Sequence, residues 1–243
     1  RECVAVISLS DLLTPWKEIE GRLRQAADFG MPVALYNPKS RKRDWQLLRA
    51  LSLYEERDLL VAKDVGRECE RLFWTKAAAL MESDALQEMI DMTTVVILPG
   101  RGCYRGKAAG KAEINLVGTG PGGRASLTAE AEAILSSSEK ILGAERYLGL
   151  VGDYPGGKVS HTGPCPDRSY ARFQEAASLA RSGKRSSILT GGDPSIFSAG
   201  WRIMDLAADR FAVHIAPGVS AFSSVAARAG APLSGDFALL SRP

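Results

Sequence analysis

The sequence contains few cysteines and histidines, the residues that form disulfides and bind transition metals. Among its 243 residues are four cysteines, whose spacing fits neither a CxxC metal site nor a compact disulfide framework. The two histidines, His161 and His214, are far apart, and His214 lies in an apolar pattern typical of a strand. The composition therefore favours a protein without a metal centre.

An excess of one charge sign is also missing, and so are long apolar runs. The formal net charge is +3, which gives no reason to expect nucleic acid but would tolerate an acidic small molecule. With neither a signal peptide nor a membrane-spanning segment legible, we expect a cytoplasmic protein without membrane partners. One basic run, Lys39 to Arg43, is interpreted first as a solvated loop.

Predicted strands and helices alternate along the chain, and 45% of the residues are hydrophobic, enough for one or two cores. This alternation predicts an α/β fold with largely parallel strands. We expect one half over 1–99, a glycine-rich basic linker over 100–112, and a second half over 113–243. The expected strands are 4–9, 32–36, 59–63, 71–75, 93–98, 114–117, 140–142, 187–190, 213–216 and 237–240. One helix is expected directly after Thr14, which would be its N-cap. Further helices are expected over 44–54, with Trp45, Leu48 and Leu51 facing inward, and over 128–135, 167–182, 201–207 and 220–229.

A glycine-rich loop follows the expected strand 114–117. Gly118, Gly120 and Gly123 satisfy G-x-G-x-x-G, which with Glu145 as a ribose-binding acid would suit a dinucleotide. Pro121 argues against that interpretation because proline has no N–H to offer a phosphate, and residues 124–127 delay the helix. A plain loop without a ligand is a further alternative.

Other loops occupy equivalent positions, because ligands of parallel sheets bind beyond the carboxyl ends of strands. They are 191–194 and 217–221 in the second half and 36–38 in the first. Their glycines and prolines suit a mixed polar and apolar small molecule better than a bare phosphate. Asp193 is the acidic residue of these loops, and its carboxylate could bind a ribose hydroxyl or an ammonium group or simply cap the following helix. Ser220 could likewise simply cap the helix that follows it.

The motifs around these loops resemble those of a known family. The second half carries VGTGPGGRASLT, LTGGDPSIFSAG and APGVSAFSSVAARAGAPL, which resemble the amino-terminal part of the tetrapyrrole methylases. The first half carries VAVISLSDLLTPW, ALYNPKSRKRDWQLLRA and MTTVVIL, which resemble the family's carboxyl-terminal part. The first-half motifs are especially similar to members that methylate carbon 17 of precorrin-3B or its cobalt-containing counterpart.

The resemblance implies a fold, a cofactor and a set of residues. The fold is two α/β domains of the tetrapyrrole methylase type with the cofactor cleft between them, here with the halves in permuted order, and a homodimer is expected. S-adenosylmethionine is the implied methyl donor and a corrin precursor the implied substrate. The implied cofactor contacts are Gly120, Pro121, Gly122, Gly191, Gly192, Asp193, Ile196, Ser220 and Ala221, with Tyr36, Asn37 and Thr94 from the other half. Expected near the substrate are Ser8, Ser10 and Asp11, with Arg41 and Arg43 as partners for its carboxylates.

The sequence also departs from the family pattern. Gly123 stands where the family loop usually has an acid, and Ala144 stands where uroporphyrinogen-type members carry one. No general base can be named. The alternatives are therefore a family member with another substrate, an inactive ligand-binding remnant, and a nucleotide-dependent oxidoreductase.

The reversed order of the halves has two explanations, a circular permutation or a fragment spanning two tandem methylases. The segment 5–8 near the start matches 238–241 near the end, and a clean permutant would contain that strand once. The repetition favours the tandem fragment.

Overall fold

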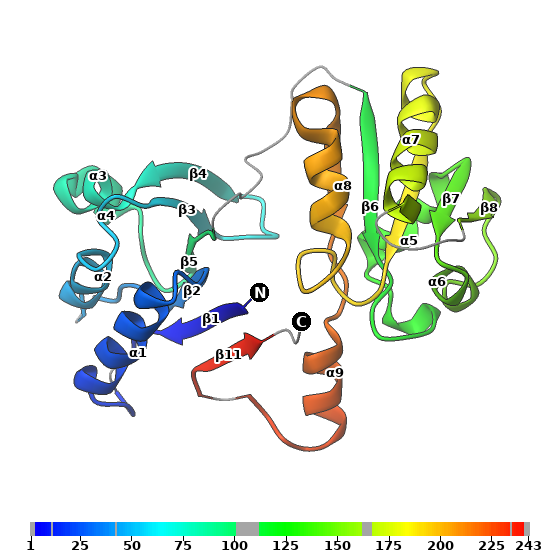
Figure 1. The fold of residues 1–243 in the computed structure, drawn as a ribbon. Helices are drawn as coiled ribbons and strands as arrows, with labels where there is room; N and C mark the ends of the chain where they lie inside the picture. Colours follow the sequence, from blue (N-terminus) through cyan, green and yellow to red (C-terminus); the bar gives the residue numbers. More distant parts are fainter. Residues whose placement is uncertain are drawn as a thin grey trace. The chain divides into compact units, whose positions relative to one another are not determined.

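The computed structural model describes residues 3–10, 12–41, 43–100, 112–161, 167–233 and 235–240. The chain forms two compact units, one of residues 1–103 with 233–243 and one of residues 104–232, and each contains its own sheet (Figure 1). Within the described part of the chain, no helix has the length and apolar character needed to span a membrane. Most of the linker predicted over 100–112 lies outside the described residues.

The first unit contains a six-stranded mixed sheet. Its strands are β1 (Cys3–Ser8), β2 (Val33–Tyr36), β3 (Asp58–Lys63), β4 (Arg71–Lys76), β5 (Thr94–Leu98) and β11 (Phe237–Leu240), in the order β11-β1-β2-β5-β3-β4. In that sheet only the β1–β2 pair is parallel among the described strands. The expectation of largely parallel strands is therefore wrong for this half, because β5 runs antiparallel to both of its neighbours, β2 and β3, and the edge strands β4 and β11 are also antiparallel to theirs.

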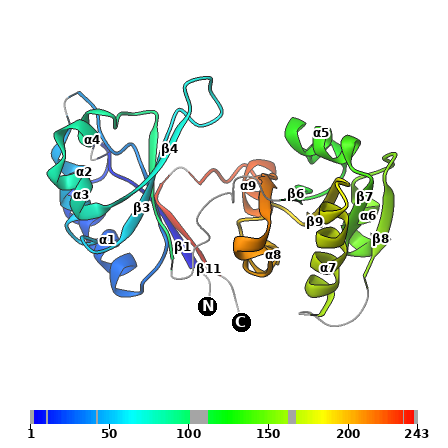
Figure 2. The same cartoon turned by 90° about the horizontal axis from the view of Figure 1, so that it is seen from above.

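Among the described residues of this unit, four helices accompany the sheet, and Figure 2 shows α1, α2 and α3 on one side of it. They are α1 (Trp16–Asp28), α2 (Trp45–Leu51), α3 (Ala77–Glu82) and α4 (Asp84–Glu88). Pro15 rather than Thr14 precedes α1, without a side-chain cap. Of the residues predicted to face inward from α2, Leu51 is buried and Leu48 is half-buried, whereas Trp45 is 48% exposed and packs edge-on against Trp16. Leu47 and Ala50, which were not predicted, are also buried.

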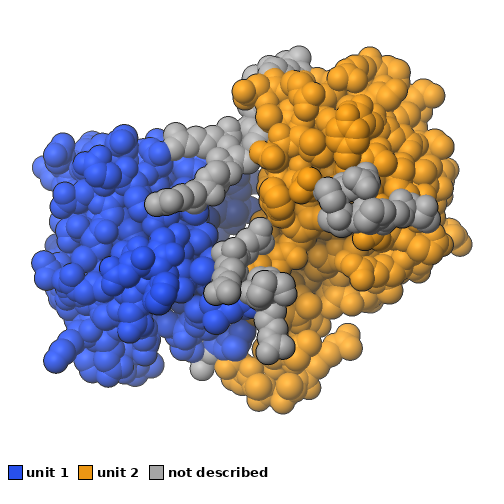
Figure 3. All heavy atoms as spheres, in the orientation of Figure 1, with its two compact units in different colours: residues 1–103, 233–243 blue, residues 104–232 orange. Residues whose placement is uncertain are grey.

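The last strand, β11, joins the first unit although the sequence pattern assigned it to the second half (Figure 3). It pairs antiparallel with β1, and Ala5 lies opposite Ala238. Asp236 fixes this register, because its carboxylate accepts the Ser8 backbone N–H at 2.8 Å and a guanidinium N–H of Arg22 at 2.7 Å. Pairing between segments more than 200 residues apart leaves no local signal.

The second unit contains the parallel sheet that the sequence predicts. Its strands are β6 (Glu113–Gly118), β7 (Lys140–Gly143), β8 (Gly157–Ser160), β9 (Ser186–Thr190) and β10 (Ala212–Ala216), in the order β10-β6-β9-β7-β8. Each neighbouring pair is parallel. The short, mostly exposed edge strand β8 was not predicted. The α/β fold class is confirmed.

Helices cover both faces of this sheet, with α7 and α8 on one side and α5 on the other (Figure 2). The helices are α5 (Ala129–Ser137), α6 (Glu145–Leu150), α7 (Asp167–Arg181), α8 (Gly200–Ala207) and α9 (Ala221–Arg228), with 3-10 turns at Arg124–Ser126 and Ala208–Arg210. Phe173 of α7 packs edge-on against Phe211 in one core, and Leu135 of α5 belongs to the other. Helices on both faces explain why β6 and β9 are buried at almost every position.

Candidate functional site

Three loops of the second unit meet at one edge of its sheet. Strands β10, β6 and β9 are neighbours and run parallel, so the loops after them start side by side. Gly120, in the loop after β6, and Gly192, in the loop after β9, exchange two backbone hydrogen bonds of 3.2 and 3.0 Å. The glycine loops of the sequence thus form one continuous backbone surface.

Glycine residues, which have no side chain, allow this close contact. A Cβ atom on Gly118 would lie 2.7 Å from the Gly192 carbonyl oxygen, and one on Gly218 would lie 2.1 Å from the same oxygen. Neither distance is compatible with a side chain, because the Gly192 oxygen belongs to the backbone and cannot rotate away. Glycine is therefore required at 118 and 218 for steric reasons.

Asp193 links two of the loops through its carboxylate. The Oδ2 atom accepts the backbone N–H of Gly218 at 3.0 Å, and Oδ1 accepts the backbone N–H of Ser195 at 2.8 Å together with the Ser195 hydroxyl. Asp193 is 9% exposed. The alternative that it caps the following helix is wrong, since α8 begins at Gly200 and has Ala199 at its N-cap position.

The far end of the glycine loop is held by a cluster that sequence reasoning missed. Arg124 forms an ion pair with Glu132, its guanidinium lies 5.3 Å from the centre of the Tyr154 ring, and the Tyr154 hydroxyl donates to Glu132. Burial and the Glu132 carboxylate raise the pKa of Tyr154 to about 12. Hydrogen bonds from Arg124 and Tyr154 lower the pKa of Glu132. At neutral pH Glu132 therefore accepts from both partners.

Thr128 connects the start of α5 to the third loop. Its hydroxyl accepts the Ala131 N–H at 3.1 Å, as the predicted N-cap requires, and donates to the Pro217 carbonyl at 3.1 Å. Because α5 begins only at Ala129, after the 3-10 turn, the glycine loop does not lead directly into a helix N-terminus. That geometry lacks the element that holds a pyrophosphate in dinucleotide-binding folds.

The structure brings together most of the residues predicted in this half. Gly120 and Gly192 are hydrogen-bonded to each other, and Asp193 accepts a hydrogen bond from Gly218 of the third loop. The other predicted residues lie on the same loops and keep part of their surface exposed: Pro121, Gly122, Gly191, Ile196, Ser220 and Ala221. Backbone groups dominate this surface, so it suits a ligand with both polar and apolar parts.

The residues predicted in the first half also gather at one end of their own sheet. Ser8 and Tyr36 are register partners in the parallel β1–β2 pair. Asn37 has a φ of 51°, and its side-chain amide donates to the Ser8 hydroxyl at 2.9 Å, which also accepts the Ser10 N–H at 3.2 Å. Tyr36 is 47% exposed, so its ring is available to a ligand.

Thr94 begins β5, which runs antiparallel to β2, so it lies at the same end of the sheet as Tyr36. However, Thr94 is 1% exposed, and its hydroxyl donates to Asp91 at 3.2 Å and accepts the Asp91 N–H at 3.2 Å. Hydrogen bonds from Lys63 and Thr93 overcome the effect of burial and lower the pKa of Asp91 to about 2. Thr94 therefore supports the turn before β5.

The two predicted substrate arginines differ in their surroundings. Ser40 and Arg43 exchange backbone hydrogen bonds of 2.8 and 3.1 Å across a tight turn. Arg41 is exposed at this turn, whereas Arg43 is 7% exposed and its guanidinium lies 3.5 Å from the Met92 sulfur. The interpretation of this run as a uniformly solvated loop is wrong for Arg43. Asp11 lies outside the described residues.

Comparison with known proteins gives the same relationship as the motifs. A family model described as Tetrapyrrole (Corrin/Porphyrin) Methylases matches residues 113–241. A probable cobalt-factor III C(17)-methyltransferase from Salmonella typhimurium is 33% identical over 132 residues, which cover 53% of this chain and 54% of the relative. A precorrin-3B C(17)-methyltransferase from Sinorhizobium sp is 41% identical over 97 residues, 38% of this chain and 36% of the relative.

Among solved structures, a uroporphyrin-III-C-methyltransferase from Thermus thermophilus is 30% identical with a TM-score of 0.42 and covers 50% of this chain and 54% of the other. The chain spans about half, or less, of the length of the curated relatives that it matches. The family match falls mainly on the unit that carries the three glycine loops.

Proposed function

Because the chain belongs to the tetrapyrrole (corrin/porphyrin) methylase family, we propose that it is a methyltransferase that uses S-adenosylmethionine to methylate a corrin precursor in cobalamin biosynthesis. The observation that carries this proposal is the junction of three loops at the edge of the second sheet. There Gly120 pairs with Gly192, and Asp193 binds Gly218.

The junction fits the proposed methyl donor chemically. S-adenosylmethionine combines an apolar ring face with ribose hydroxyls and an amino-acid end, and so needs backbone groups and close approach rather than a phosphate cradle. Pro121, Pro194 and Pro217 each remove a donor that a phosphate would use. Gly120, Gly122 and Gly192 all have positive φ, a backbone conformation that glycine adopts readily because it has no Cβ.

We propose precorrin-3B or cobalt-precorrin-3 as the substrate and carbon 17 as the methylated position. Support comes from the first-half motifs and from the names of the two relatives reported above. Ser8, Ser10 and Arg41 are the proposed substrate contacts of the first unit. Arg43 is proposed to hold the turn that presents Arg41, because the Arg43 side chain is buried.

The proposed reaction is an in-line displacement. When bound, S-adenosylmethionine would supply a methyl group from its sulfonium to a ring carbon of the substrate, and the electron pair of the broken methyl–sulfur bond would remain on sulfur. The chain's residues would orient the two reactants and exclude water, which can supply much of such a rate enhancement. Asp193 would act by holding two loops in place, since its carboxylate oxygens already accept hydrogen bonds.

Calorimetric titration tests the cofactor proposal. S-adenosylhomocysteine should bind the full chain with a 1:1 stoichiometry, and NAD should not bind. Transfer of a labelled methyl group from S-adenosylmethionine to precorrin-3B or its cobalt form then tests turnover. Binding without transfer would favour the alternative of a ligand-binding remnant, and binding of NAD would overturn the proposal. Light scattering during gel filtration tests the proposed homodimer.

A further inference from the structure

The second unit contains a cavity of about 320 Å³ that is lined in part by the end of β9 and the loop after it. Its lining comes from α6, the first turns of α7, the end of β9 and the loop that follows. Three arginines line it, Arg146, Arg168 and Arg172, and the described lining residues include no acid. Such a lining favours a ligand with negative charge.

Two of these arginines lie on one face of α7. Arg168 and Arg172 are four residues apart in the first turns of a 15-residue helix, so their side chains lie on the same side. The start of that helix adds a partial positive charge. Arg172 is 8% exposed, and a guanidinium keeps its charge even when buried.

A buried hydroxyl also lines the cavity. Thr190, the last residue of β9, is 5% exposed, and its Oγ1 atom has no hydrogen-bond partner among the described residues. A buried hydroxyl without a partner costs free energy unless a ligand or water satisfies it. Thr190 therefore offers the cavity a donor for an oxygen-rich ligand.

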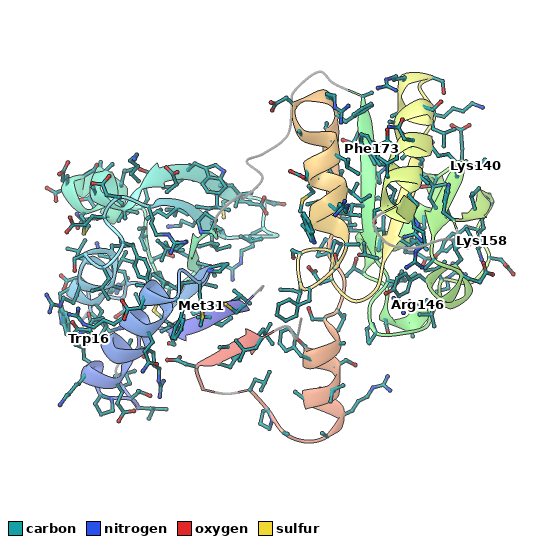
Figure 4. All side chains as sticks on the ribbon, in the orientation of Figure 1. Trp16, Met31, Lys140, Arg146, Lys158 and Phe173 are labelled. Carbon is teal, nitrogen blue, oxygen red and sulfur yellow. The ribbon has the colours of Figure 1, made fainter. Side chains whose placement is uncertain are left out.

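The wall between this cavity and the glycine loops is tightly packed. A Cβ atom on Gly191 would lie 2.6 Å from the Tyr147 ring, so only glycine allows that ring its position. Arg146, labelled in Figure 4, donates to the Tyr147 hydroxyl at 2.8 Å, and its guanidinium lies 4.6 Å from the ring centre. Gly191 therefore contributes both to the proposed cofactor loop and to the arginine cavity.

We propose that this cavity binds carboxylate groups on the rim of the tetrapyrrole substrate, an inference that rests on the proposed function. Corrin precursors carry many carboxylates, and arginine pairs with them in a two-pronged geometry that lysine cannot provide. The amino-acid end of the methyl donor carries the same group. All three arginines lie on α6 or α7 and none on the glycine loops of the proposed cofactor site, which favours the substrate as the source.

The test uses uroporphyrin III, an octacarboxylate, titrated against the full chain by fluorescence. The cavity variant is Arg146→Gln with Arg168→Gln, and the matched control is Lys184→Gln with Arg185→Gln. The control removes the same charge from an exposed turn at the opposite end of β9. We expect the dissociation constant for uroporphyrin to rise at least tenfold in the cavity variant and less than twofold in the control. S-adenosylhomocysteine affinity should stay within twofold in both.

Three results would overturn the proposal. They are an unchanged uroporphyrin affinity in the cavity variant, an equal loss of uroporphyrin affinity in the control variant, or a loss of S-adenosylhomocysteine affinity alone in the cavity variant. If the double variant does not fold, the exposed Arg146→Gln and the single Thr190→Val replace it with the same criteria. Wild-type chain that binds uroporphyrin through the cavity but not S-adenosylhomocysteine would refute the proposed function and leave the carboxylate site standing.

Discussion

The Oδ2 atom of Asp193 accepts the backbone N–H of Gly218 at 3.0 Å, although the two residues are 25 positions apart in the chain. Because the other carboxylate oxygen binds Ser195, the side chain spans two loops. Asp193 therefore connects the end of β9 to the end of β10, and the shape of the loop junction depends on its charge.

Replacing Asp193 by alanine should weaken S-adenosylhomocysteine binding by roughly 1–3 kcal/mol, because Gly218 loses a charged acceptor and the loops separate. The free energy of unfolding should fall by a similar amount. Calorimetry and urea unfolding measure the two effects. Asp205→Ala, at an exposed position of α8, is the control and should change neither. Unchanged affinity in the Asp193 variant would remove the residue from the site.

Gly218→Ala should disturb the junction by steric contact alone. The new Cβ would lie 2.1 Å from the Gly192 carbonyl oxygen, so the loops must move apart at a cost of about 1–3 kcal/mol or more. Gly149→Ala is the matched control, since its Cβ meets nothing within 4 Å. In α6 that change should stabilise by roughly 0.5–1 kcal/mol. Thermal unfolding and ligand titration of both variants check this; equal behaviour would contradict the packing argument.

Arg43→Ala should destabilise the first unit by about 1–3 kcal/mol, because a buried side chain is lost. Arg41→Ala, two residues away and exposed, should change the free energy of unfolding by less than about 0.5 kcal/mol. Urea unfolding separates the two. If Arg41 contacts the substrate as proposed, its variant should bind uroporphyrin more weakly at unchanged stability. A stability loss in the Arg41 variant alone would reverse these assignments.

Tyr54 should make the first unit sensitive to alkali. Burial raises its pKa to about 12, and its hydroxyl donates to the Leu23 carbonyl at 2.8 Å. The pKa of a tyrosine hydroxyl in an unfolded chain is roughly 10, so Tyr54 loses its proton at a lower pH in the unfolded state than in the folded state. This stabilisation is complete below about pH 10 and disappears as the pH rises towards 12.

Urea midpoints at pH 9 and pH 11 measure this dependence. Tyr54→Phe should be less stable at pH 9 by about 1 kcal/mol and should lose less stability on going to pH 11 than the wild type. Tyr170→Phe, at a position 53% exposed, should keep the wild-type pH dependence. An identical slope in the Tyr54 variant would show that other groups cause the alkaline loss.

Much of the second unit follows from local sequence patterns. The mostly apolar runs 114–117 and 213–216 and the run 187–190 were predicted as strands, and they lie in a sheet with helices on both faces. The glycine loops after them could be placed at one edge because parallel strands end at one side of a sheet. Thr128 was identified as a cap from the residue type and its place before the helix.

Contacts between distant segments could not be derived in this way. The pairing of β11 with β1 depends on Asp236 meeting Ser8 across 228 residues, and antiparallel order in the first sheet depends on which strands meet. The burial of Arg43 and the three arginines around one cavity likewise depend on how the elements pack. The sequence by itself determined most of the strands, the glycine loops and the family. Only the tertiary structure decided the partners of Asp193 and the charge of the neighbouring cavity, because side chains meet there through packing rather than through spacing along the chain.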